Sequence, residues 1–309
     1  MSQNRTTTDQ WLVFTLADQK YAIHVDCVRE LTRSADHQIR SLPQTPDDIV
    51  GALSLRGRVI TIRDLRTMIK LPSLAKETAE VTEILEKREE DHVNWIKELK
   101  ASVLEDREFT LARDPQKCAF GKWYDALMAD ESALQMLTNS NFTLYRLIGQ
   151  MGAPHMMIHS IADRVTDLVR KKEFDKAHVL IEQTGEVYLE TMIALMHQIR
   201  GLLNELRKPL IVILEWQDRQ LGVQVDSVDS VIRIDEEKIS PLPERMGQSG
   251  VFTSMARIGD ESGLLLLLDG TKLFDEVDAG LEPPDWSELG NEIAQSVAVE
   301  GSAPAPALA

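Results

Sequence analysis

The sequence changes character twice, and the two changes limit which folds are available to the chain. Residues 11–72 contain short runs of β-branched and aromatic residues between turn residues, a pattern typical of strands. Residues 73–208 are rich in Glu, Lys, Leu, Ala and Met, with apolar residues at helical spacing. The strand pattern then returns over residues 209–277. A helical block therefore interrupts a β-rich block.

Proline marks both boundaries of the helical block. Pro72 precedes its first predicted helix and Pro209 follows its last, positions that suit a residue with a fixed φ and no N–H. Each part of the β block is small for a core of its own, so we expect the two parts to share one. The fold class predicted is α+β and multidomain, with one β domain carrying a helical insertion.

Four helices are expected in the insertion, over residues 73–108, 121–137, 154–171 and 173–206, with a helical or turning segment from Asn141 before the third. At about 1.5 Å per residue, the first and last are each about 50 Å long. An inserted chain must return close to the point where it left. These two helices should therefore lie antiparallel, side by side.

Composition and charge exclude several classes of protein. The chain has 34 Lys and Arg against 50 Asp and Glu, a formal net charge of −16, which repels nucleic acid. No apolar run approaches the roughly 20 residues of a membrane span. Two cysteines are too few for a disulfide framework, so we expect a cytoplasmic protein. Residues 1–10 are polar and residues 278–309 are acidic and then Ala/Pro-rich, and both are predicted to be disordered.

Four residues of the insertion are candidate metal ligands. His155 and His159 lie four apart on one helix and share a stripe with apolar residues, so both should point inward. His92 lies on the inward stripe of the first helix, and Cys118 lies near the start of the second. Taken singly, such a His pair also occurs by chance, and a lone buried His or Cys is more often structural. Together, three His and one Cys suit zinc.

Three segments of the insertion resemble the chemoreceptor zinc-binding (CZB) domain. They are His-Val-Asn-Trp at residues 92–95, Cys-Ala-Phe-Gly-Lys-Trp at 118–123 and Pro-His-Met-Met-Ile-His at 154–159. The resemblance covers about residues 75–205 of the sequence. It implies an antiparallel four-helix bundle that binds Zn²⁺ through His92, Cys118, His155 and His159.

The flanking β block resembles the CheW-like adaptor domain. The resemblance is carried by Tyr21-Ala-Ile, Val28-Arg-Glu, Leu55-Arg-Gly and Gly222-Val-Gln-Val-Asp, although Ser54 stands where that family usually has Asn. It implies paired small β-barrels that connect methyl-accepting chemoreceptors to a histidine kinase. On that basis the partner-binding candidates are Val28, Glu30 and Arg56. From the residues alone, Arg56 could equally be an ordinary surface charge, and Glu30 a solvated carboxylate.

A catalytic zinc site is disfavoured, because four protein ligands leave no position for water and Met156 stands where a metalloprotease helix has its Glu. We therefore expect a non-catalytic adaptor. Cys118 is the one oxidisable ligand, so the bundle would sense zinc or an oxidant such as hypochlorous acid and pass the change through the long helices to the β block. The alternative is a purely structural zinc, with the bundle as a spacer or as the contact of a homodimer. A zinc hydrolase is a poor third.

Overall fold

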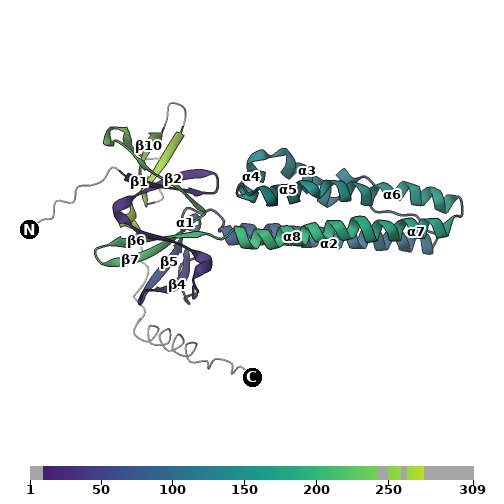
Figure 1. The fold of residues 1–309 in the computed structure, drawn as a ribbon, viewed down its shortest axis with the longest axis horizontal. Coiled ribbons are helices and arrows are strands. Elements are labelled where there is room, and N and C mark those ends of the chain that lie inside the picture. The colour runs from purple at the N-terminus through teal and green to yellow at the C-terminus, as the bar shows by residue number, and fades with distance from the viewer. Residues whose placement is uncertain (1–9, 243–249, 259–262, 275–309) are drawn as a thin grey trace, which may run out of the picture. The chain divides into compact units, whose positions relative to one another are not determined.

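The structure is a computed structural model that describes residues 10–242, 250–258 and 263–274 (Figure 1). The tails predicted to be disordered, residues 1–10 and 278–309, lie outside the described residues except for Gln10, which begins a strand. The chain divides into two compact units. The β unit comprises the residues up to Leu74 and those from Lys208 onward, and the helical unit comprises Ala75–Arg207.

The β unit contains two sheets. In the first, the strands follow the order β8-β1-β2-β11-β10-β9. Their bounds are β1 Gln10–Leu16, β2 Gln19–His24, β8 Ser227–Arg233, β9 Ile239–Pro241, β10 Phe252–Ile258 and β11 Gly263–Leu268. Two of these strands come from before the helical insertion and four from after it. β11 lies parallel to β2, and β8 lies antiparallel to β1.

The second sheet follows the order β3-β6-β7-β5-β4. Its bounds are β3 Val28–Arg33, β4 Ile49–Leu55, β5 Arg58–Asp64, β6 Leu210–Trp216 and β7 Arg219–Val225. An isolated bridge between Arg40 and Ala52 brings the chain after β3 to β4, at the opposite edge of the sheet. Both sheets therefore mix strands from the two sides of the insertion, which confirms that the two β parts form one domain.

The largest apolar cluster of the β unit draws on both sheets. Phe14 and Leu16 come from the first, and Leu214 and Val223 from the second. The short helix α1, Leu65–Met68, contributes Leu65 to the same cluster. Short 3₁₀ turns occupy Val25–Cys27, Ser34–Asp36 and Glu236–Lys238. Consecutive residues are buried along β1 and β2, because both faces of these strands are covered: Phe14 and Tyr21 pack into this cluster, and Val13 and Ala22 pack into a second one.

Seven α-helices make up the helical unit within the described residues. Their bounds are α2 Leu74–Leu104, α3 Ala119–Ala129, α4 Glu131–Thr138, α5 Phe142–Gln150, α6 Gly152–Arg170, α7 Phe174–Thr184 and α8 Glu190–Leu206. A π-helical turn, Gly185–Leu189, joins α7 to α8 without breaking the helical path, and a 3₁₀ turn, Pro115–Lys117, precedes α3.

Two helix predictions need correction. The helix expected over 121–137 is wrong as one element, because Asp130 has extended backbone dihedrals and its side chain accepts a hydrogen bond from the Ala133 N–H, 2.9 Å, capping a new helix. The first helix ends at Leu104 instead of 108. Asp106, with φ 50°, turns the chain away there.

The long helices run antiparallel, as predicted. α2 is joined to α8 by Glu77–Arg207 at 3.0 Å and by Glu89–Arg200 at 3.1 Å. Further along α2, Lys100 lies 3.0 Å from Glu182 of α7. Residue numbers rise on α2 as they fall on its partners, and Figure 1 shows α2 and α8 side by side.

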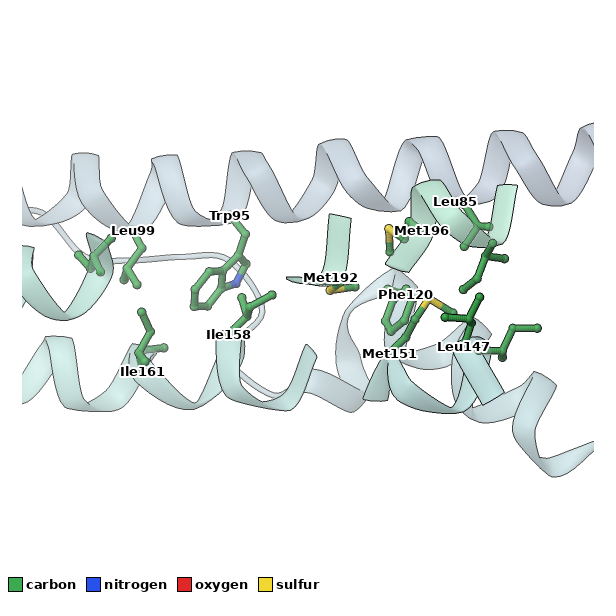
Figure 2. Close-up of a cluster of buried hydrophobic side chains, with 14 of the residues drawn as sticks. Leu85, Trp95, Leu99, Phe120, Leu147, Met151, Ile158, Ile161, Met192 and Met196 are labelled. Carbon is green, nitrogen blue, oxygen red and sulfur yellow. The ribbon is translucent and has the colours of Figure 1, made fainter. Parts of the chain in front are cut away.

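A continuous apolar core runs between these helices (Figure 2). α2 contributes Leu85, Trp95 and Leu99, and α6 contributes Ile158 and Ile161 on the facing side. These residues recur at three- and four-residue intervals, which places them on one stripe of each helix. The candidate metal ligands lie within this core.

Candidate metal centre

The fold brings all four predicted ligands together. His92 lies in α2, Cys118 immediately precedes α3, and His155 and His159 lie one turn apart in α6. One possible ligand atom from each residue falls in a group whose members all lie within 4.8 Å of one another. Residues separated by up to 67 positions in the sequence thus form one compact cluster of three nitrogens and one sulfur.

The three imidazoles are almost completely removed from solvent. His92, His155 and His159 are 2%, 3% and 3% exposed, whereas Cys118 is partly exposed. Aromatic rings enclose them: Phe120 lies 4.6 Å from His155 and Trp95 lies 4.9 Å from His159, between ring centroids. Polar rings buried in this way must be paired, or their burial costs free energy.

Two of the imidazoles are oriented by backbone carbonyls. His92 Nδ1 lies 2.7 Å from the Arg88 carbonyl oxygen, and His159 Nδ1 lies 3.1 Å from that of Ala112. A carbonyl can only accept, so each Nδ1 carries the proton and each Nε2 presents a lone pair. Within the described part of the chain, these two buried Nε2 atoms have no hydrogen-bond partner. A metal ion is the partner that such lone pairs fit.

Cys118 is held by the start of α3. Its Sγ accepts a hydrogen bond from the Gly121 N–H at 3.2 Å, so the residue caps the helix through its sulfur, and Sγ lies 3.1 Å from His155 Nε2. A Cβ on Gly121 would lie 1.9 Å from the Pro115 carbonyl oxygen. Only glycine therefore lets the 3₁₀ turn pack against α3 and set the sulfur in place. A helix N-terminus also favours a thiolate.

The electrostatics of the cluster suit a cation. Burial, followed by repulsion from His92 and His159, lowers the pKa of His155 to about 3. Burial also lowers the pKa of His159, to about 4, and that of His92. The imidazoles are therefore neutral at pH 7 and free to donate lone pairs. Burial raises the pKa of Cys118, so its thiol keeps the proton unless a cation displaces it.

The donor set fits zinc. Three imidazole nitrogens and one thiolate sulfur are a ligand set that zinc takes in four-coordinate structural sites. His92, Cys118, His155 and His159 would hold the ion, and the Arg88 and Ala112 carbonyls would fix two of the rings. No sequence pattern points to these carbonyls, because any residue supplies a backbone oxygen. Trp95 shares the Ala112 carbonyl, its Nε1 donating to the oxygen at 2.8 Å.

The partner-binding candidates lie in the β unit. Arg56 Nη2 and Glu30 Oε2 are 2.7 Å apart, which joins β3 to the β4–β5 turn. Arg56 and Gly57 both have positive φ, 50° and 79°, as a two-residue turn of this kind requires. The Arg56 side chain is 72% exposed, and Val28 packs partly buried against the core. The structure thus brings Glu30 and Arg56 together, while their role in binding stays a prediction.

No helix in the described residues is both long enough and apolar enough to cross a membrane. The ligand cluster lies in a helical unit whose helices are amphipathic, with acidic and basic side chains on their outer faces.

Comparison with known proteins identifies both parts of the chain. The model of the CheW-like domain matches residues 10–93 and 189–278, more than half of the sequence, and that of the chemoreceptor zinc-binding domain matches residues 92–166. The ends of the first match reach into α2 and α8, which belong to the helical unit.

One similar protein and one similar solved structure illustrate the resemblance. The chain is 39% identical over 61 residues to the "Chemotaxis protein CheW" of Klebsiella aerogenes, a stretch of 20% of this chain and 36% of that protein, so it matches about a third of the relative's length. The crystal structure of the scaffolding protein TtCheW from Thermoanaerobacter tengcongensis aligns with 84% of this chain and 88% of its own, at 14% identity and a TM-score of 0.38. The family matches carry the assignment: the chain belongs to the CheW-like family, and its CheW-like domain is interrupted by a chemoreceptor zinc-binding domain.

Proposed function

We propose that the chain is a chemotaxis adaptor that links methyl-accepting chemoreceptors to a histidine kinase and that its helical unit senses zinc or an oxidant. CheW-like proteins are non-catalytic scaffolds, so the expectation that the chain is not an enzyme is confirmed. The relative from Klebsiella aerogenes is named a chemotaxis protein, which supports the adaptor role. Glu30, Arg56 and Val28 are the proposed contacts to a receptor or kinase.

One observation carries the sensing role: a buried cluster of three imidazoles and a thiol in which two Nε2 atoms lack any partner within the described chain. A cation bound in the cluster would offset the cost of burying these unpartnered polar atoms. We assign Zn²⁺ to His92, Cys118, His155 and His159. When bound, zinc keeps the Cys118 sulfur deprotonated.

Cys118 supplies the redox chemistry. Its thiolate attacks the chlorine of hypochlorous acid, forming an S–Cl bond while hydroxide leaves; water then replaces chloride, giving Cys–SOH, a proton and chloride. Sulfur loses two electrons and chlorine gains them. A sulfenic acid is a poor ligand, so Cys118 leaves the cluster. The N-terminus of α3 then loses its tether to His155, which lies 3.1 Å from the sulfur.

The helices provide a route for that change. α2 begins at Leu74, ten residues after β5 ends, and α8 ends at Leu206, four residues before β6 begins. Both connections are short and lead to strands of the second sheet, with the short helix α1 between β5 and α2 and no helix between α8 and β6. A changed spacing of α2 and α8 would therefore pull on β5 and β6.

Metal analysis tests the zinc assignment and the redox response. We expect one zinc per purified chain, lost as about one equivalent of hypochlorous acid oxidises Cys118. Cys118→Ser should weaken zinc binding and abolish the oxidant response, whereas Cys27→Ala, a cysteine buried in the β unit, should leave both unchanged. Protein that has never met a chelator and holds no zinc would refute the four-ligand site.

The autophosphorylation rate of a histidine kinase tests whether the zinc cluster is coupled to the β unit. The chain would be reconstituted with chemoreceptors and a histidine kinase, and autophosphorylation measured with and without zinc or oxidant. Flexible Gly/Ser segments inserted after Pro72 and before Pro209 should abolish the response while zinc binding persists. A response that survives both insertions contradicts coupling through the helices.

The competing proposal is a structural zinc in a spacer or homodimer module. It is supported by the position of the imidazoles inside the main core of the helical unit, where loss of any ligand would disturb packing. It predicts that Cys118→Ser unfolds the helical unit outright and that oxidant produces no graded response. Sedimentation of the wild type with and without zinc would detect the homodimer.

A further inference from the structure

The three imidazoles of the cluster are not held alike. His92 and His159 each bond a backbone carbonyl through Nδ1, as described above. His155 makes one hydrogen-bond contact within the described residues, between its Nε2 and Cys118 Sγ at 3.1 Å. Nδ1 of His155 therefore has no hydrogen-bond partner among the described residues, although His155 is only 3% exposed.

A cavity of about 250 Å³ adjoins His155. It lies between α6, α3 and the 3₁₀ turn, and its lining includes His155, Gly121, Gln116, Tyr124, Met156 and Asp125. Because one water takes about 30 Å³ of liquid volume, the cavity holds a molecule of a few heavy atoms with room to spare. Gly121 and His155 both line this cavity, and both also contact Cys118 Sγ.

We propose that this cavity admits and binds a small, uncharged molecule with an O–H group, such as hypochlorous acid, and delivers it to Cys118. The Nδ1–H of His155 donates to the oxygen of that molecule. This inference rests on the proposed oxidant response and adds to it an entry site and a selectivity. The reaction is the two-electron oxidation given above, with hypochlorous acid as the oxidant and chloride and Cys–SOH as products.

The charges around the cavity favour a neutral molecule over an anion. Its lining includes the carboxylates of Asp114 and Asp125. Asp114 accepts a hydrogen bond from the Gln116 N–H at 3.0 Å and lies 3.7 Å from Lys117 Nζ, which offsets part of its charge. Asp125 is exposed and has no ion pair among those found in the described chain. A bulky or anionic oxidant would therefore be disfavoured by both size and charge.

Two adjacent methionines allow a matched test. Met156, 62% exposed, lines the cavity, whereas Met157, 40% exposed, lies on the same helix and does not. Met156→Trp should close the cavity and Met157→Trp should not. Both variants remove one oxidisable, exposed methionine, so scavenging of oxidant changes equally.

The measurement is the rate of Cys118 oxidation in the full-length zinc-loaded chain, by sulfenic acid trapping and mass spectrometry. With hypochlorous acid, we expect Met156→Trp to slow oxidation about tenfold and Met157→Trp to match the wild type. With N-chlorotaurine, a larger anion carrying the same electrophilic chlorine, Asp125→Lys should raise the rate about threefold. Zinc content and the melting temperature establish that each variant is folded.

The outcomes separate this inference from the proposed function. Equal rates in Met156→Trp, Met157→Trp and wild type would overturn the entry site while leaving the oxidant response intact. A wild-type Cys118 that hypochlorous acid leaves unmodified would refute the oxidant response itself. If Met156→Trp loses its zinc, Gln116→Trp would fill the cavity from the 3₁₀ turn, with Gln183→Trp, at an exposed glutamine that does not line the cavity, as its control. The rates of Cys118 oxidation in these two variants are then compared in the same way.

Discussion

The two units of this chain bury polar groups in opposite ways. In the β unit, buried charges find partners within the protein: Arg66 Nε lies 2.8 Å from Asp226, and Arg63 Nε lies 2.6 Å from Asp48. In the helical unit, the buried imidazoles face one another, and two of their nitrogens have no partner within the described chain. The described buried charges of the first unit are paired within the polypeptide, whereas the second unit presents lone pairs that the proposed zinc ion would fill.

Under the proposed function, this difference separates the adaptor scaffold from the sensing module. A unit whose buried groups are satisfied internally keeps one structure whatever the metal concentration, which suits a platform for partner proteins. A unit whose centre depends on an ion has a stability, and hence a population of folded states, that follows the ion. The predictions below test whether the stability of each unit depends on its own buried polar groups.

Removal of zinc should produce the largest difference. Zinc at 1,000 times its dissociation constant stabilises the folded state by about 4 kcal/mol, and a chelator removes that contribution. We expect hydrogen exchange to accelerate throughout the core of the helical unit, at residues such as Leu99 and Ile158, and to stay unchanged in β1 and β2 of the first sheet. Equal acceleration of hydrogen exchange in both units would show that the β unit also depends on zinc for its stability.

Breaking the buried ion pair should affect the other unit. Asp226→Ala leaves Arg66, which is 3% exposed, without its carboxylate and should destabilise the β unit by about 3–5 kcal/mol. Asp229→Ala, which removes an exposed pair with Lys20 at 3.0 Å, should cost at most about 1 kcal/mol. Chemical denaturation with and without zinc measures both. If zinc restored the free energy of unfolding that Asp226→Ala removes, the stability of the β unit would not depend on its own buried ion pair alone.

Acid should destabilise the zinc-free helical unit selectively. Folded-state pKa values of about 3 for His155 and about 4 for His159 lie below the value of about 6.5 in an unfolded chain. The unfolded state therefore binds more protons below pH 6.5, and stability falls as the pH falls through that value. Melting of chelated protein from pH 7.5 to 5.5 should show the transition of the helical unit moving to lower temperature. A transition that does not move would mean that the imidazoles are not buried without metal.

Two glycine substitutions should give the smallest effects, with opposite signs. Gly121→Ala forces the Pro115 carbonyl away from α3, displaces Cys118 and should weaken zinc binding about 10–100-fold. Gly201→Ala, in α8 with open space around the added methyl group, should stabilise the unit by about 0.5–1 kcal/mol without changing zinc affinity. Competition with a zinc chelator and thermal melting measure the two quantities. Unchanged affinity in Gly121→Ala would show that the turn does not set the sulfur.

Much of the fold was predictable because its signals are local. The change from strand to helix spacing, and the prolines at 72 and 209, predicted an insertion over residues 73–208, and the helical unit of the structure comprises Ala75–Arg207. Helix boundaries were less certain, since Asp130 looks like any polar residue in a helical stretch until its side chain caps α4. The mixing of strands in both sheets was expected from domain size, but its order, such as β7 beside β5, depends on long-range pairing.

Residue types and their spacing along single elements were enough to predict the chemistry of this protein: which residues donate nitrogen and sulfur, that two of the donors share a helix face, and that strands surround helices. Three further properties became visible only in the folded chain: Arg88 and Ala112 orient two imidazoles, His155 lines a cavity, and Glu30 pairs with Arg56. Those properties depend on backbone atoms and empty space brought together from distant segments, and neither is written in the residue types.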